Sequence, residues 1–129
     1  MITPLLLAAL LSSPVPAAVA AEHPLDPLTA PEIEAAVKIA RKAKSLPDAA
    51  FFPQVALDEP SKESLRSWPG KAVPRRAALV VYDRAANAMS EAIVDLAARR
   101  LVSWSPRPGA QPNVMLEEFE KFPAVVKAD

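Results

Sequence analysis

The strongest local pattern in the sequence is a capped amphipathic helix that begins near residue 29 and ends before Pro47. Thr29 is a good N-cap, and Glu32 follows at the capping-box spacing. Apolar residues then recur at helical spacing and mark one face, namely Ile33, Val37 and Ala40 with Ala36 beside them. Such a helix is stable only when this face is buried, so the rest of the chain has to supply a surface that covers it.

A β-hairpin is the clearest candidate for that surface. Residues 77–82 alternate between two fairly apolar faces, which predicts a central strand, and residues 89–96 form the return strand. Residues 84–88 turn the chain between them. With only two glycines in the sequence, Asn87 is the natural left-handed residue of this turn.

Three weaker segments complete the predicted fold. Residues 51–58 read as an edge strand, because Pro53 cannot donate inside a sheet, and residues 101–105 read as a further strand. Residues 61–68 predict a short helix or turn with Ser61 as its cap. The fold class is therefore α+β, with one helix packed on an antiparallel sheet of about four strands, a cystatin-like arrangement.

Both ends of the chain differ in composition from this domain. Residues 1–21 carry a short apolar run and the small-x-small sequence at Ala18 to Ala20, which predicts a signal peptide cleaved near Ala20 or Ala21. A disordered Ala/Pro leader is the alternative. Export implies a periplasmic or secreted protein without a membrane span. The α+β domain then covers residues 22–110.

Residues 111–129 are predicted to be a linker followed by a separate helix. Its apolar positions are Met115, Leu116, Phe119, Phe122 and Val126. An amphipathic helix with no element after it is what the start of a truncated second domain looks like, and its apolar face is expected to need a partner.

Composition excludes several kinds of chemistry. Lys plus Arg and Asp plus Glu both total 15, so no net charge attracts nucleic acid. The absence of cysteine excludes thiolate catalysis and thiolate metal ligation, and His23 is the only histidine. Serine triads and glycine-rich phosphate loops lack the residues that they need.

The remaining candidates for chemistry each have a plainer structural interpretation. Tyr82-Asp83 is interpreted as a strand tyrosine followed by the aspartate of a hairpin turn. His23 is interpreted as part of the extended segment HPLDPL. The other candidates are interpreted as solvated or packing residues: Arg75-Arg76 and Arg99-Arg100 at strand or loop ends, Glu117, Glu118 and Glu120 on a solvated helix face, and Trp68 and Trp104 as core or interdomain contacts. No catalytic, cofactor-binding or metal residue is predicted.

Five stretches in order resemble the second N-terminal domain, and the start of the third, of the copper-containing primary-amine oxidases. They are HPLDPLTAPEIEAAVKIARK, LDEPSKESL, VPRRAALVVYDRA, EAIVDLAARRLVSW and QPNVMLEEFEKFPAVVKAD. The family usually has Gly where Asn87 stands, and often near Arg99, where a left-handed arginine is costly.

The resemblance implies oxidation of primary amines to aldehydes, with release of ammonia and hydrogen peroxide. In the family, copper and topaquinone lie in a large C-terminal domain. This chain lacks the three histidine ligands, and Tyr82 stands in Val-Tyr-Asp rather than in the Asn-Tyr-Asp/Glu precursor motif. The resemblance thus implies a non-catalytic domain that packs on an amine-oxidase catalytic domain or dimer, inactive on its own.

Two other roles remain open. The chain can be a free-standing exported binding module, although it lacks a cystatin-type Gln-x-Val-x-Gly loop. It can also be a regulator that docks on an intact oxidase.

Overall fold

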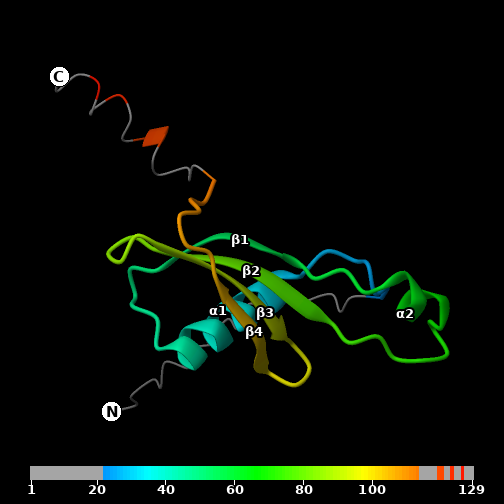
Figure 1. Cartoon of the computed structure of the whole chain (residues 1–129). Helices are drawn as coiled ribbons and strands as arrows, with labels where there is room; N and C mark the ends of the chain where they lie inside the picture. The colour runs from blue at the N-terminus through cyan, green and yellow to red at the C-terminus, as the bar shows by residue number, and fades with distance from the viewer. Residues whose placement is uncertain (1–21, 114–118, 121–122, 124–125, 127–129) are drawn as a thin grey trace, which may run out of the picture.

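The computed structural model describes residues 22–113, 119–120, 123 and 126. Within this part of the chain, helix α1 (Ala30–Lys44) packs on a four-stranded antiparallel sheet. The strands are β1 (Phe51–Leu57), β2 (Arg76–Asp83), β3 (Ala88–Asp95) and β4 (Arg100–Pro106), and they lie side by side in that order (Figure 1). The predicted α+β class is confirmed. Of the predicted linker and helix of residues 111–129, only 111–113, 119–120, 123 and 126 are among the described residues.

Helix α1 begins and ends as its sequence predicts. Thr29 is the N-cap, and its backbone N–H donates to Glu32 Oε2 at 2.8 Å. Ser45 ends the helix in the left-handed conformation (φ 48°). The weak Glu34–Lys38 pair, at 4.0 Å, lies on the solvent side.

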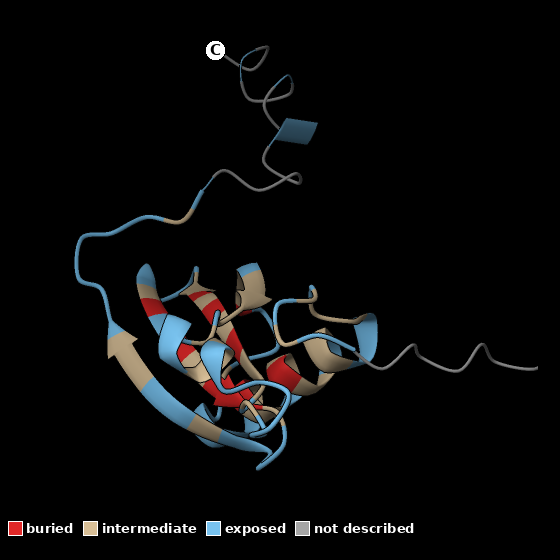
Figure 2. Cartoon of the chain, turned by 90° about the vertical axis from the view of Figure 1, so that its right-hand side faces the viewer, coloured by how far each residue is buried: buried red, intermediate tan, exposed pale blue. Residues whose placement is uncertain are grey.

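The core lies between α1 and the face of the sheet that we call the inner face, and Figure 2 shows the buried residues gathered there. Its buried members are Ala36, Ala40, Ala77, Leu79, Val81, Ala92 and Val94. The buried stripe of α1 is therefore centred on Ala36 and Ala40 with Ile39 beside them, whereas Ile33 and Val37 are only half-buried. The predicted face was wrong in this respect, because alanines let the helix approach the strands more closely than larger side chains do.

The hairpin is confirmed. Strands β2 and β3 pair in continuous register from Arg76↔Asp95 to Asp83↔Ala88, and Asn87 has a φ of 46°. The two outer strands are both irregular. The pairing of β1 shifts register between Phe51 and Gln54, and that of β4 shifts opposite Ile93 and Val94.

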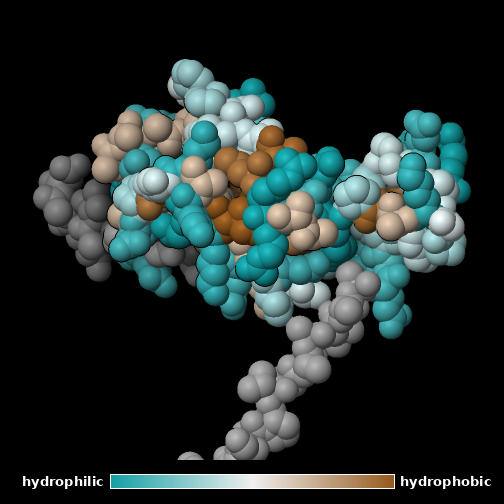
Figure 3. Space-filling view, turned by 90° about the horizontal axis from the view of Figure 1, so that it is seen from below, coloured by the Kyte–Doolittle hydropathy of each residue, from teal (hydrophilic) through white to brown (hydrophobic). Residues whose placement is uncertain are grey.

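Helix α2 (Lys62–Arg66) projects from the end of the sheet opposite the hairpin turn (Figure 1). Ser61 caps it by accepting from Ser64 N at 3.2 Å, as predicted. Seen from below, hydrophobic side chains gather near the centre of the molecule among mostly hydrophilic ones, with smaller hydrophobic spots to either side (Figure 3). No helix among the described residues is long and apolar enough to cross a membrane.

Candidate functional site

Arg75 and Glu32 form the main polar cluster of the domain, although 43 residues separate them in sequence. Arg75 Nε donates to Glu32 Oε1, and Nη2 donates to Oε2 at 3.1 Å. The two side chains are only 18% and 23% exposed. A paired, charge-assisted contact of this kind is strong and orients both partners.

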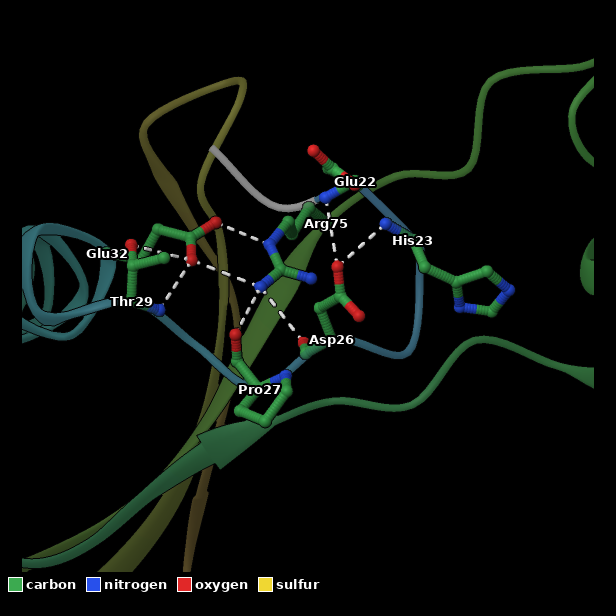
Figure 4. Close-up of polar contacts among 7 residues, drawn as sticks. All are labelled: Glu22, His23, Asp26, Pro27, Thr29, Glu32 and Arg75. Carbon is green, nitrogen blue, oxygen red and sulfur yellow. Dashed lines mark hydrogen bonds and ion pairs between the residues drawn. The ribbon is translucent and has the colours of Figure 1, made fainter. Parts of the chain in front are cut away.

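The same guanidinium also holds the segment that precedes α1. Arg75 Nη2 donates to the carbonyl oxygens of Asp26, at 3.0 Å, and Pro27, at 2.8 Å (Figure 4). The residue before β2 thus connects the N-terminal segment to the first turn of the helix.

The cluster is unsuited to proton transfer. The hydrogen bond from Arg75 lowers the pKa of Glu32 from 4.5 to about 2; burial opposes this shift, and the bonds from Thr29 reinforce it. Glu32 is therefore ionised at every pH near neutrality, and both of its oxygens accept hydrogen bonds. A general acid or base needs a pKa closer to the working pH. The arrangement is one that stabilises the fold.

The segment before α1 is a turn, and the predicted extended conformation of HPLDPL was wrong at its start. Asp26 Oδ2 accepts from the backbone N–H groups of Glu22, at 2.9 Å, and His23, at 2.8 Å. Asp26 N in turn donates to His23 O at 3.0 Å. An aspartate that accepts from nearby backbone groups competes with the extended conformation that the prolines favour.

His23 packs against Trp68 in a T-shaped contact with ring centroids 4.6 Å apart. Its Nδ1 accepts from Leu25 N at 3.1 Å, so this nitrogen is occupied. No group of three or more His, Cys, Asp or Glu within the described ranges could hold a metal ion. The donors described here do not fit a copper site, because nitrogen ligands would have to come from several histidines.

Tyr82 and Asp83 belong to the hairpin, as predicted. The Tyr82 hydroxyl donates to Asn87 Oδ1 at 2.9 Å. Asp83 Oδ1 accepts from Ala85 N at 3.0 Å and from Ala86 N at 3.2 Å. The Tyr82 hydroxyl and Asp83 Oδ1 therefore both have partners within the turn.

The remaining candidates are dispersed. The interpretation of Arg75 as a solvated residue was wrong, because a helix, a turn and a strand meet around it. Arg99 is exposed and left-handed (φ 51°), in the conformation that the family's glycine favours. Trp104 packs against the core and Trp68 is 38% exposed. Glu117 and Glu118 lie outside the described residues, and Glu120 is exposed.

These features define a small α+β domain whose polar cluster stabilises its fold. Residues 23–107 match the family described as "Copper amine oxidase, N2 domain". The chain therefore belongs to the copper amine oxidase family and carries its N2 domain.

Individual relatives agree with this assignment. The chain is 40% identical over 114 residues to a primary amine oxidase of Arthrobacter sp. (strain P1), covering 88% of this chain and 17% of that protein. It is 36% identical over 102 residues to a primary amine oxidase of Klebsiella aerogenes, covering 75% and 13%. The chain thus spans less than a fifth of either relative.

A solved structure shows the same fold. The copper-containing benzylamine oxidase of Hansenula polymorpha superposes with a TM-score of 0.66 at 20% identity. The match covers 82% of this chain and 19% of that chain.

Proposed function

We propose that this chain is a non-catalytic domain that docks on and supports the catalytic part of a copper and topaquinone amine oxidase. The observation that carries the proposal is the match of residues 23–107 to the N2 domain. The family reaction is the oxidative deamination of primary amines to aldehyde, ammonia and hydrogen peroxide. Copper and topaquinone belong to the part of the relatives that lies outside this match.

The described residues support a docking role rather than a catalytic one. In their main ionisable cluster both Glu32 oxygens and the Nε and Nη2 atoms of Arg75 are engaged in internal hydrogen bonds, and Glu32 stays charged. The same proposal includes export of the chain, with cleavage of a signal peptide near Ala20 or Ala21. Export puts the domain in the periplasm or outside the cell.

The test uses a probe that we call the oxidase remainder. It is the Arthrobacter primary amine oxidase polypeptide from which the 114-residue segment that matches this chain has been removed. We expect the chain and the oxidase remainder, produced in the same cells, to co-purify in a fixed ratio. The chain alone should release no hydrogen peroxide from methylamine or benzylamine.

Two results contradict the proposal. Amine-dependent peroxide release by the purified chain would show that it is catalytic. A well-folded chain that does not co-purify with the oxidase remainder would favour the alternative, a free-standing exported binding module.

A further inference from the structure

The face of the sheet opposite α1 carries an apolar strip with polar side chains beside it. We call it the outer face. Its apolar members are Ala56, Ala78, Val80, Tyr82, Met89 and Ile93, and its polar members are Gln54, Arg76, Glu91, Asp95, Ser103 and Ser105, which share one side of the four strands. A shallow hollow of about 230 Å³ lies over it, lined by Gln54, Ala78, Val80, Glu91 and Ile93 together with Leu79 and Ala92. Val80 and Ile93 are only half-buried, unlike the inner-face residues beside them.

The chain leaves the domain along this face. Arg107 N donates to Met89 O at 2.8 Å. The Arg107 guanidinium pairs with Glu91 Oε2, at 2.6 Å from Nη2 and 3.0 Å from Nε. Residues 111–113 then line a second hollow with Val80 and Met89, and Figure 1 shows this orange stretch passing the ribbons of β1 and β2.

The size of the outer face suits an interface between domains. Four strands about 4.8 Å apart and about 23 Å long cover roughly 400 Å². Interfaces between domains of one chain bury about 300–750 Å² on each side. The inner face is already covered by α1, so the outer face is the sheet surface that remains for a partner.

We propose that the outer face docks against the part of an amine oxidase that follows the N2 domain in the longer relatives. This inference rests on the proposed function and adds the surface that performs it. The path of the chain identifies the occupant, because the N2 match ends at residue 107 and the stretch after it crosses the outer face. The polypeptide that follows this domain in the longer relatives therefore emerges beside this face.

The first test places a charge at the centre of the contact. Val80→Lys and Ile93→Lys put an ammonium group at half-buried positions of the outer face, from which the long lysine side chain can reach water in the free domain. We expect each to raise the dissociation constant for the oxidase remainder at least tenfold. Leu25→Lys is the matched control, since Leu25 is 44% exposed in the segment before α1 and lines neither outer-face hollow, and it should leave binding within twofold.

The second test needs no variant. Oxidative labelling of the Met89 side chain should fall at least threefold when the full chain is bound to the oxidase remainder, whereas labelling of Trp68 should stay unchanged. Thermal unfolding of each free variant shows whether its fold is intact, and the Met89 readout stands if a lysine variant fails to fold.

The outcomes separate the two proposals. Binding that neither lysine variant weakens, or Met89 labelling that binding leaves unchanged, overturns the outer-face inference and leaves the proposed function standing. Failure of the unaltered chain to bind the oxidase remainder overturns both. A homodimer of the free chain that Val80→Lys dissociates assigns the outer face to a second copy and overturns the occupant proposed here.

Discussion

The inner and outer faces of the sheet are built from alternate residues of the same strands, yet only one is fully buried. On β2, Leu79 and Val81 are each 2% exposed under α1, whereas their neighbours Val80 and Tyr82 are half-buried on the outer face. Successive residues of a strand point to opposite faces, and β2 is apolar at successive positions, so both faces of the sheet receive apolar side chains. The covering element, rather than the composition of the strand, decides which face becomes core.

Polar contacts hold α1, the element that covers the inner face, in place. Arg75 ties the segment before α1 and the first turn of α1 to the start of β2, at one end of the inner layer. On the outer face the corresponding contact is the Arg107–Glu91 pair, whose side chains are 52% and 47% exposed. An exposed pair contributes little to stability, whereas a largely buried one is costly to break. The two faces therefore differ in how firmly the chain above them is held.

Removing Arg75 should have the largest effect. Arg75→Ala leaves the Glu32 carboxylate in a largely buried position and frees the carbonyls of Asp26 and Pro27. We expect the free energy of unfolding in urea to fall by about 3–5 kcal/mol, the range for breaking a buried pair from one side. Arg107→Ala, the outer-face equivalent, should cost less than about 1 kcal/mol. Equal losses in the two variants would contradict the difference between the faces.

Low pH should lower the free energy of unfolding, because it protonates Glu32 and weakens the contact that holds α1. The folded-state pKa of Glu32 is lowered to about 2 from 4.5, so its contribution is complete above pH 4.5 and disappears as the pH falls towards 2. A shift of this size corresponds to about 3 kcal/mol. The measurement is urea unfolding from pH 6 to pH 2. The control is Glu32→Gln, which should be less stable at neutral pH and should show a smaller acid loss. An identical pH profile for both proteins would exclude Glu32 as the source.

Local rules were sufficient for most of the framework. The capping box at Thr29, the turn residue Asn87 and the edge position of the strand with Pro53 all follow from backbone chemistry within a few residues, and the structure confirms them. The family assignment was also accessible, because it depends on motifs in order rather than on any one contact.

Two of the errors involve contacts between distant parts of the chain, and the third, at His23, is local. Arg75 finds Glu32 across 43 residues, and no spacing in the sequence signals that contact. The predicted apolar face of α1 was right at Ala36 and Ala40 but wrong to include Ile33 and Val37, because hydrophobicity favours the larger side chains whereas close approach to the sheet selects the alanines. The turn at His23 was missed because Asp26 captures backbone groups that the neighbouring prolines were expected to hold extended.

The smallest effect tests the two faces with adjacent residues of one strand. Val81→Ala removes two methyl groups from the inner face and should lower the free energy of unfolding by about 2 kcal/mol, from lost burial and the cavity left behind. Val80→Ala makes the same chemical change on the outer face, where water and neighbouring side chains can fill the space, and should cost less than about 1 kcal/mol. Both values come from urea unfolding of the free chain. In the complex with the oxidase remainder, the difference between the losses caused by Val80→Ala and Val81→Ala should become smaller, because docking would bury Val80 as α1 buries Val81. If Val80→Ala lowers the free energy of unfolding of the free chain as much as Val81→Ala does, the outer face is already buried in the free chain, which contradicts the proposed docking.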